Sequence, residues 1–499
     1  MESTTGYKPY FDPDYESLIE RIHPPRVCVD NETCKDCTLV KVDSANKHGI
    51  LLEMVQVLTD LDLLISKSYI SSDGGWFMDV FHVMDQLGHK LTDDTLIHYI
   101  QQSLCGGRRG GKTKVKEVIN RTCIGSVMGS LHLSTDYTAF EMTAIDRPGL
   151  LSEISAVLAE LGCNVAAVVA WTHNTRAATI LYMEDETKGG GPITNAERLL
   201  HVEEQLEIVV GAHHGKGERR MVKLVEGPPS ARVHTERRLH QLMQADMDYE
   251  INCSKDGNAS GSSSSSGGNV RRSSSSSIVT EVSIENCKEK GYSVVNVRCK
   301  DRPKLLFDTV CTLTDLEYVV FHAAISSRGS LAVQEYYIRQ RDGCTLGSER
   351  ERHRVRQYLV AAAERRVSHG LKLDVCTKNR VGLLSDITRV FRENGLSVSR
   401  AEISTRGEKA IGSFYVTDAS TGKHADPKTV ELVRSEIGAT VLEVNKSFSA
   451  GRTSYGSNSQ NSRSSSTCSG GVEERPAKLS LGSLLWAQFE RLSGNFGSA

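Results

Sequence analysis

The sequence lacks the long apolar run and the leader that would place a chain in or across a membrane. Its longest local apolar stretch, Val165–Trp171, has the length of a strand, whereas a membrane helix needs about 18 apolar residues. The opening residues, Met1–Gly6, include neither a basic nor an apolar stretch, so no secretory signal is predicted. We therefore expect a cytoplasmic or nuclear chain with no membrane partner.

An excess of either charge is also absent. The chain carries 60 Lys and Arg against 62 Asp and Glu, and its formal net charge is −2. Recognition of nucleic acid or of anionic lipid usually needs a basic surplus. The 13 cysteines are an odd number spread through 499 residues, which favours reduced thiols over a disulfide framework. The composition thus predicts no nucleic-acid partner.

Apolar side chains are scarce, at 39% of residues, and two Ser-rich stretches account for much of the shortfall. Residues 253–277 contain the runs Ser262–Ser266 and Ser273–Ser277, and residues 447–499 open with a similar stretch of Ser, Gly and Asn. Neither stretch has enough apolar surface to offset the entropy lost on folding. We predict a disordered linker and a Ser-rich tail. The apolar segment Leu479–Phe489 within the tail either docks as a short helix or stays disordered.

An internal repeat organises the rest of the chain. Four segments read Asn or Asp, basic, any residue, Gly (Lys once), apolar, Leu: Asn46–Leu51, Asp146–Leu151, Asp301–Leu306 and Asn379–Leu384. The offsets between these copies also align apolar positions further downstream, such as Leu58, Leu158, Leu313 and Phe391. A register held over four copies is a strong signal of repeated structural units.

Each copy follows the same local pattern. A β-like run precedes the motif and an amphipathic helix follows it; two further β-runs, a second helix and a last strand complete the pattern. We expect the Asn or Asp of the motif to cap the first helix, and Pro148 and Pro303 to lie in its first turn. The predicted second helices are Asp93–Leu104, Asn195–Leu206, Glu349–Glu364 and Pro427–Ile437.

The order β-α-β-β-α-β predicts an α+β fold of four tandem ferredoxin-like units, each an antiparallel sheet with its helices on one face. An open sheet face or edge invites pairing, so we expect the units to pair side by side within the chain or in a homo-oligomer. The predicted boundaries are an N-terminal segment at 1–36, units at 37–120, 136–226, 290–369 and 370–446, and a helical connector at 227–252.

With Asp-Arg-Pro-Gly-Leu-Leu at 146–151 between strand and helix, this pattern resembles the ACT domain, a small regulatory module that binds amino acids. Four such units, with a Ser-rich break between the second and third and no attached catalytic domain, resemble the plant ACT-domain-repeat proteins over nearly the whole chain. The resemblance implies amino-acid binding between units, where the turn of one unit faces a strand of its neighbour. It also implies a role in sensing nitrogen or amino-acid status.

The turn after the first strand of each unit is the candidate ligand site. Glycine lets a ligand approach the backbone closely, and the N–H groups that open the helix favour a carboxylate. The Asn or Asp either meets an α-ammonium group or only caps the helix, and the basic residue beside it either attracts a carboxylate or is solvated. His48 and Lys304 weaken the case in the first and third copies. The candidate ligand-binding residues are Asp146, Arg147, Gly149, Leu150, Asn379, Gly382, Leu383, Asn46, Gly49 and Asp301.

Other chemical motifs are weaker. Cys34–Cys37 is a single CxxC without a second pair at zinc spacing, and His213-His214 has no third ligand at a recognisable spacing. Gly106–Thr113 fits the letters of a phosphate-binding loop but follows a predicted helix end instead of a strand. We therefore predict no metal, no cofactor and no catalytic residue.

Two functions remain open. The first is a non-enzymatic amino-acid sensor that signals ligand binding to an unidentified protein partner. The second is an interaction scaffold whose units no longer bind ligand, which Lys304 and the altered first motif favour. An enzyme is the least expected, because residues 1–36 leave too little chain for a catalytic domain ahead of the first unit.

Overall fold

The computed structural model describes residues 25–45, 49–73, 76–105, 137–213, 215, 218–226, 233–250, 278–287, 291–367, 370–438 and 441–445. The expected linker at 253–277 and tail at 447–499 lie outside these residues, as do Asn46 and Gly106–Thr113. No helix among the described residues is long and apolar enough to cross a membrane.

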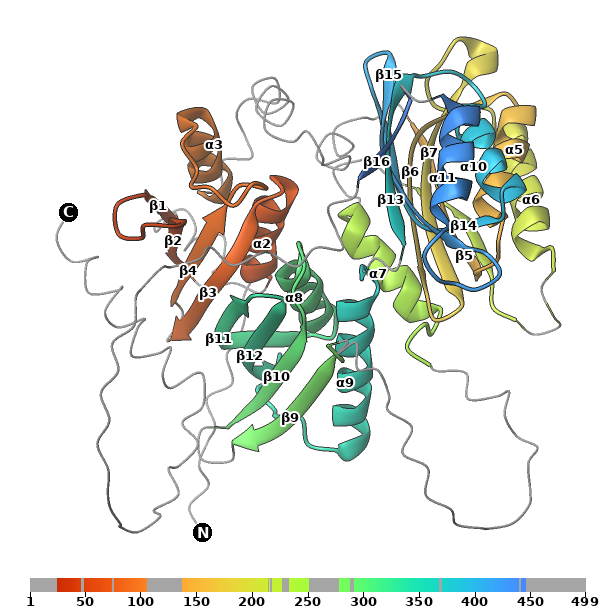
Figure 1. Cartoon of the computed structure of the whole chain (residues 1–499). Helices are drawn as coiled ribbons and strands as arrows, with labels where there is room; N and C mark the ends of the chain where they lie inside the picture. The colour runs from red at the N-terminus through yellow and green to blue at the C-terminus, as the bar shows by residue number, and fades with distance from the viewer. Residues whose placement is uncertain are drawn as a thin grey trace, which may run out of the picture.

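Four α+β units follow one another along the chain (Figure 1). Unit 1 comprises β1 (Arg26–Asp30), β2 (Thr38–Ala45), α2 (Ile50–Asp60), β3 (Leu64–Asp73), β4 (Trp76–Met84) and α3 (Asp94–Leu104). Unit 2 comprises β5 (Thr138–Ile145), α5 (Leu150–Glu160), β6 (Cys163–His173), β7 (Arg176–Asp185), η2 (Glu186–Lys188), α6 (Ala196–Gly211) and β8 (Met221–Leu224). After the connecting helix α7 (Thr235–Ala245), unit 3 comprises β9 (Glu281–Cys287), β10 (Tyr292–Lys300), α8 (Leu305–Asp315), β11 (Tyr318–Arg328), β12 (Leu331–Gln340) and α9 (Glu349–Glu364). Unit 4 comprises β13 (Leu371–Lys378), α10 (Leu383–Glu393), β14 (Leu396–Arg406), β15 (Lys409–Asp418), α11 (Pro427–Ile437) and β16 (Leu442–Asn445).

The units pair in an interleaved way, unit 1 with unit 3 and unit 2 with unit 4. Sheet A has the strand order β1-β2-β4-β3-β11-β12-β10-β9, and sheet B has the order β16-β13-β15-β14-β6-β7-β5-β8. Each sheet is thus two four-stranded halves joined by one antiparallel pair, β3 with β11 or β6 with β14. The expected side-by-side pairing is confirmed, and it joins units that are not neighbours in the chain.

A pseudo-twofold axis relates the halves of each sheet. Val169 and Glu402 occupy the same position of the repeat and pair with each other across the β6–β14 junction. Tyr69 and Ala324 do the same across the β3–β11 junction. Each unit therefore presents the same strand to its partner. The turn of one unit faces its partner in the same way as the equivalent turn of the partner faces it.

In units 1 and 3, the order of strands and helices along the chain differs from the expected βαββαβ. In units 2 and 4 the edge strands are the last strands, β8 and β16, whereas in units 1 and 3 they are β1 and β9, which come first. The edge position is filled from either side of the chain: β1 and β9 form antiparallel hairpins with β2 and β10, whereas β8 and β16 return after the second helix to pair antiparallel with β5 and β13. Unit 1 thus begins at Arg26 instead of residue 37, and unit 3 at Glu281 instead of residue 290.

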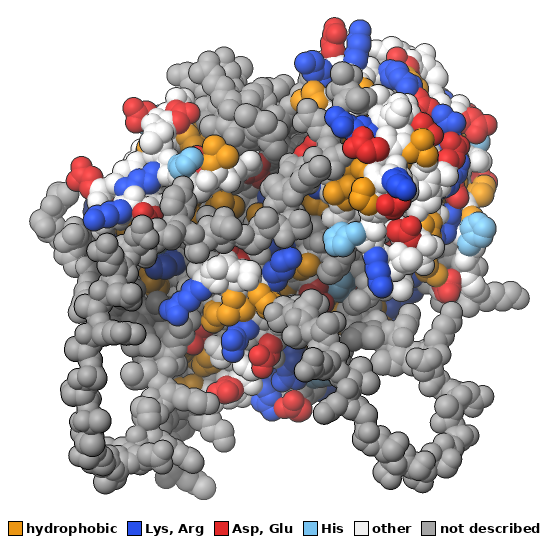
Figure 2. All heavy atoms as spheres, in the orientation of Figure 1, with side chains coloured by type: hydrophobic (Ala, Val, Ile, Leu, Met, Phe, Trp, Pro, Cys, Tyr) orange, Lys and Arg blue, Asp and Glu red, His pale blue; other side chains and the backbone are white. Residues whose placement is uncertain are grey.

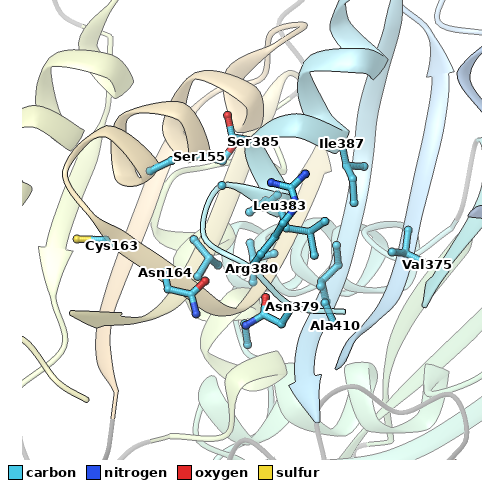
Figure 3. A pocket seen from close by; sticks show the side chains of 17 residues that line it. Ser155, Cys163, Asn164, Val375, Asn379, Arg380, Leu383, Ser385, Ile387 and Ala410 are labelled. Carbon is cyan, nitrogen blue, oxygen red and sulfur yellow. The ribbon is translucent and has the colours of Figure 1, made fainter. Parts of the chain in front are cut away.

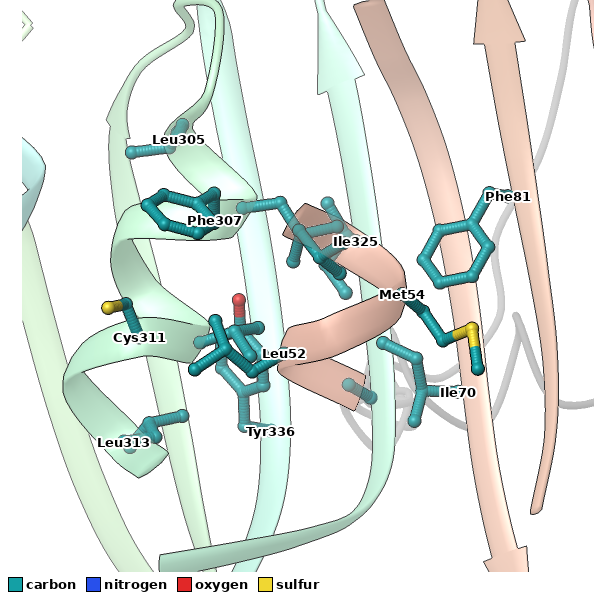
Figure 4. Close-up of a cluster of buried hydrophobic side chains, with 14 of the residues drawn as sticks. Leu52, Met54, Ile70, Phe81, Leu305, Phe307, Cys311, Leu313, Ile325 and Tyr336 are labelled. Atoms are coloured by element: carbon teal, nitrogen blue, oxygen red, sulfur yellow. The ribbon is translucent and has the colours of Figure 1, made fainter. Parts of the chain in front are cut away.

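Each pair of units shares one hydrophobic core. In sheet A, Leu52 and Met54 of α2, Phe307 and Leu313 of α8 and Phe81 of β4 belong to a single buried cluster (Figure 4). Burial of each such side chain contributes about 1.5–3 kcal/mol. A corresponding cluster joins α5 and α10 over sheet B. Because neither half has a separate core, each pair of units is expected to unfold as one body.

Helix α7 connects the two pairs. Leu239, Leu242 and Met243 cover Val169 and Trp171 on the face of sheet B that the cluster of α5 and α10 leaves open. On its other side α7 contacts α8, so it lies between sheet B and the helices of unit 3 (Figure 1). The stretch expected to be a helical connector therefore packs between the two pairs.

Candidate functional site

The turn before the first helix is a β-turn that requires a left-handed residue. In unit 2 the Leu150 N–H donates to the Arg147 carbonyl at 3.2 Å, and Gly149 has φ 84° and ψ −4°. These are the dihedrals of the third residue of a type II turn, and Pro148 stands at the second position, which favours proline. Unit 4 repeats the turn, because the Leu383 N–H donates to the Arg380 carbonyl at 3.2 Å and Gly382 has φ 77°.

The expectation that Asp146 and Asn379 cap the helices is wrong. The residue at the cap position is Gly149 or Gly382, and neither helix has a side-chain cap hydrogen bond. The turn places Asp146 four residues ahead of the helix, where its own N–H donates to the Thr175 carbonyl at 2.8 Å. Pro148 for the same reason lies before the helix, not in its first turn. The first N–H groups of these helices are consequently left without a side-chain acceptor.

The turn of unit 2 opens into a cavity, which we call the turn-2 pocket. Its volume is about 500 Å³ when the space at its open mouth is included. Unit 2 contributes the predicted residues Asp146, Arg147, Gly149 and Leu150, with Ser152, Ala170, Thr172 and Thr179, and unit 4 contributes Thr388, Arg392, Leu396, Val398 and Ser399. The pocket is therefore built between two units.

Charged groups of both signs line the turn-2 pocket, namely the acidic Asp146 and the basic Arg147 and Arg392. Burial raises the pKa of Asp146 to about 6, and a hydrogen bond with the Thr172 side chain limits the rise. The stem of Arg392 crosses Gly149 so closely that a β-carbon added there would lie 2.8 Å from Arg392 Cδ. Arg392 is exposed overall and contributes positive charge at the pocket from α10 of the neighbouring unit.

The equivalent cavity, the turn-4 pocket, lies between the turn of unit 4 and strand β6 (Figure 3). Asn379, Arg380, Gly382 and Leu383 line it from unit 4; Ser155, Ala159, Cys163 and Asn164 line it from unit 2, and its volume is about 490 Å³ including its mouth. Between the two pockets, the hydroxyls of Ser155 and Thr388 lie 3.1 Å apart on the contact of α5 with α10. These two residues hold the same position of the repeat, so they lie near the pseudo-twofold axis.

The pseudo-twofold axis relates the two pockets but their charges differ. Asn379 replaces Asp146, and Ala159, whose Cβ is 3.8 Å from where a Gly382 β-carbon would lie, replaces Arg392. The turn-4 pocket thus has an amide and a methyl group where the turn-2 pocket has a carboxylate and a guanidinium. The two pockets are therefore expected to differ in the ligand charge that they accept.

The arginine of the motif pairs with an acidic residue of the helix that follows it. Arg147 donates two hydrogen bonds to the Glu153 carboxylate, at 2.9 and 2.5 Å, and lowers the pKa of that carboxyl. Arg302 pairs with Asp308 at 2.6 Å, and Arg380 pairs with Asp386. In each case the partner lies six residues further on, which clamps the turn to the start of the helix.

The turn of unit 3 is closed by α7. Lys304 adopts φ 64°, the left-handed conformation that glycine has in the other turns. Its ammonium nitrogen lies 2.8 Å from Glu236 of α7 and 3.6 Å from Asp62 of unit 1. Asp301 donates its N–H to the Ser330 carbonyl at 2.8 Å. Asp301 lines neither the turn-2 nor the turn-4 pocket.

Glu236 lies at the centre of a buried ionic cluster. Besides Lys304, its carboxylate accepts a hydrogen bond from Arg366 at 2.6 Å, and Arg366 also lies 3.2 Å from Asp308. Burial alone would raise the pKa of Glu236, but Arg366 and Lys304 lower it well below its ordinary value. On the same helix His240 contacts Asp308 at 2.8 Å. The glutamate of α7 thus supplies the carboxylate that pairs with Lys304 at this turn.

In unit 1, Gly49 has φ 82° and space around it, since a β-carbon there would meet nothing within 4 Å. Gly49 lines neither the turn-2 nor the turn-4 pocket. Among the sequence candidates, the structure therefore brings those of units 2 and 4 to pockets and leaves Gly49 and Asp301 elsewhere.

Sequence reasoning missed Arg392 and Thr388, which come from the helix of the neighbouring unit. No local signal marks them, because their role depends on α5 packing against α10. Thr172, near the end of β6, was not among the candidate ligand-binding residues. The structure hydrogen-bonds it to Asp146 and, through its hydroxyl, to the Ser399 carbonyl at 3.1 Å.

Comparison with known proteins identifies the modules. Residues 33–111 match the model of the ACR family N-terminal ACT domain, and residues 138–199 and 373–438 match that of the ACT domain. The chain is 52% identical over 497 residues to ACT domain-containing protein ACR1 of Arabidopsis thaliana, covering 99% of each chain. It is also 52% identical over 437 residues to ACT domain-containing protein ACR3 of the same plant, covering 87% of this chain and 90% of the relative.

Proposed function

Because this chain belongs to the ACR family of ACT domain-containing proteins, we propose that it is a non-enzymatic sensor that binds an amino acid between units 2 and 4. The observation that carries the proposal is the turn-2 pocket. There a carboxylate, an arginine side chain and an uncapped helix N-terminus converge from two units. An amino acid offers an ammonium group for the carboxylate, and a carboxylate for the arginine and the helix N-terminus.

The proposed orientation follows from charge. Asp146 receives the α-ammonium group, and the N–H groups at the start of α5, together with Arg392, receive the α-carboxylate. Gly149 keeps the backbone accessible, since any side chain there would meet Arg392. The ligand side chain then points toward the apolar lining that Leu396 and Val398 supply. The turn-4 pocket, which has Asn379 and Ala159 in place of Asp146 and Arg392, is proposed to bind more weakly.

Signalling is proposed to run through strand β6 and helix α7. Trp171 of β6 lines the turn-2 pocket, and its ring packs against His240 of α7 with centroids 5.1 Å apart. A ligand that favours one placement of β6 therefore also favours one placement of α7. Coupling energies between sites are typically about 1–3 kcal/mol, enough to change the affinity for a protein partner several-fold.

The scaffold alternative has one observation in its favour. The turn of unit 3 is filled by the chain's own Glu236, so at least one turn of the repeat serves protein packing. If the other turns also served only protein packing, the units would act only as pairing surfaces. On the face shown in Figure 2, basic and acidic side chains of the described residues are interspersed, which suits a protein partner better than a polyanion.

The experiment is a thermal-shift and calorimetric screen of the full chain against the twenty amino acids. A ligand at 100 times its Kd should stabilise the folded protein by about 2.7 kcal/mol. Gly149→Val should abolish the response, whereas Gly49→Val, which has a similar backbone strain but lines neither pocket, should preserve it. No response to any amino acid at millimolar concentration, or a response that survives Gly149→Val and Gly382→Val together, would favour the scaffold.

A further inference from the structure

Three metal-ligating side chains converge on unit 1, far from the pockets between units 2 and 4. The ligand atoms of Cys34, Cys37 and His82 all lie within 4.8 Å of one another. The two cysteines lie in the loop between β1 and β2, and His82 lies on β4 opposite Leu39. Because paired residues of an antiparallel sheet share a face, as do residues two apart on one strand, Cys37, Leu39 and His82 lie on one side of sheet A.

The cluster is enclosed and has an unsatisfied member. Cys37 is 8% exposed and His82 is 7% exposed, and the floor beneath them is formed by Leu39, Tyr69 and Val80. The Nδ1 atom of His82 is buried without a hydrogen-bond partner. Native proteins rarely leave a buried polar atom unpaired, and such an atom calls for a water or an ion. The unpaired Nδ1 atom of His82 therefore indicates that a ligand binds at this cluster.

We propose that Cys34, Cys37 and His82 bind one Zn²⁺ ion. Two thiolates and an imidazole form the Cys₂His set that zinc accepts, with water completing the tetrahedron. Ideal Zn–S and Zn–N bonds place the ligand atoms about 3.5–3.8 Å apart. The observed spread of up to 4.8 Å therefore closes by small side-chain rotations, without movement of the sheet. Among the described residues this group of possible ligands has three members, so water takes the fourth position.

The loop that carries the cysteines is already held in place by other contacts. The Asp30 carboxylate accepts hydrogen bonds from the N–H groups of Glu32 and Thr33, at 2.8 and 3.0 Å. The Asn31 amide donates to the Leu91 carbonyl at 2.9 Å, and Thr38 donates to the Asn31 side chain at 2.5 Å. Zinc would therefore bind a preformed site, and its loss would leave the fold intact.

The site explains why a CxxC motif without a second pair can still be functional. The third ligand comes from a strand that is remote in sequence and adjacent in the sheet. This zinc site is independent of the proposed amino-acid sensing, because it lies on sheet A and both pockets lie on sheet B. Failure of one proposal leaves the other standing.

The test measures zinc on the full chain. The protein is purified in reductant without chelator, its zinc is quantified by inductively coupled plasma mass spectrometry, and the stripped protein is titrated with Zn²⁺ against a chromophoric chelator. Co²⁺ is then substituted, because thiolate-bound Co²⁺ absorbs in the visible and near ultraviolet. We expect Cys34→Ser, Cys37→Ser and His82→Asn each to lose one equivalent of zinc per chain and the thiolate–Co²⁺ absorption.

Matched controls are Cys28→Ser and His89→Asn, which alter an exposed cysteine and an exposed histidine of unit 1. Both should keep the zinc equivalent and the Co²⁺ spectrum. Since Cys34 is only partly buried, Cys34→Ser should also keep the circular dichroism and the Tm of the zinc-stripped wild type, which separates metal loss from misfolding. Equal zinc content in wild type and Cys34→Ser, or a Cys34–Cys37 disulfide that persists in millimolar glutathione, would overturn the proposal.

Discussion

Replacing Glu236 by alanine tests whether α7 holds the two pairs of units together. The Glu236 side chain is 1% exposed and lies between Arg366 and Lys304, at 2.6 and 2.8 Å. Its removal leaves two buried cations without their shared partner. Loss of one member of a buried ion pair costs about 3–5 kcal/mol, because the remaining charge stays desolvated and loses its nearest partner; Arg366 keeps Asp308 at 3.2 Å, and Lys304 keeps Asp62 at 3.6 Å. We expect Glu236→Ala to lower the free energy of unfolding by that amount.

The assay is equilibrium unfolding of the full chain in urea, followed by tryptophan fluorescence. Trp171 is fully buried at the joint, with Arg366 Cζ 4.5 Å from the centre of its ring, so its emission reports the loosening of α7. The matched control is Glu197→Ala, which removes an exposed glutamate from the first turn of α6. It should cost at most about 1 kcal/mol, the contribution of the helix dipole.

A second substitution makes the test stricter. Lys304→Gly removes one of the stranded cations and restores the residue that the other turns carry at this left-handed position. In the Glu236→Ala background it should recover at least about 1 kcal/mol, the usual cost of a left-handed side chain. A loss no larger than that of Glu197→Ala, or a double variant no more stable than Glu236→Ala alone, would refute the idea that charge pairing holds the joint.

The pH dependence follows from the same cluster and from the turn-2 pocket. Folding lowers the pKa of Glu236, so its contribution to stability is present above the ordinary value of 4.5 and is lost as the pH falls below that value. In urea unfolding at a series of pH values, Glu236→Ala should therefore lose less stability than the wild type as the pH falls. The pKa of Asp146 is raised from 3.8 to about 6, so wild type should lose up to about 3 kcal/mol as the pH rises through that window, and Asp146→Asn should abolish the loss. Gly149→Ala and Gly49→Ala should both lose about 1–2 kcal/mol in thermal unfolding through left-handed strain, but only Gly149→Ala, which meets Arg392, should weaken amino-acid binding. Phe391→Ala should cost about 3–5 kcal/mol and, by hydrogen exchange, expose units 2 and 4 together, because the fully buried ring belongs to their shared core.

The local features of the fold were predictable because they depend on local chemistry. A strand, a turn with a left-handed glycine and an amphipathic helix are each specified by residues near one another in the chain. The positions of Gly149 and Gly382 therefore identified both turns that open into pockets. The capping role assigned to Asp146 was wrong, because a type II turn moves the start of the helix past the residue that would cap it.

The pairing of units could not be read from the sequence. Every unit presents an equivalent strand edge, so the repeat alone allows unit 1 to pair with any other unit. The choice depends on contacts between distant residues, such as the approach of Ser71 to His322 at 3.4 Å. The sequence also showed that Lys304 replaces the glycine of the motif, but it could not predict that Lys304 pairs with Glu236 of α7. Arg392 reaches its pocket only after unit 4 has docked on unit 2.

The interleaved pairing constrains how the chain can be made. Ser71 and His322 are separated by 251 residues, so at about 5–20 residues per second unit 1 waits roughly 12–50 s for its partner to leave the ribosome. During that wait the edge of β3 and the apolar side of α2 have no proper partner, and unit 2 emerges first with an equivalent edge at β6. A nascent chain could thus join units 1 and 2 in order of appearance and trap both. The rate of synthesis, or a chaperone that shields the first edge, is expected to decide how much of the product reaches the interleaved fold.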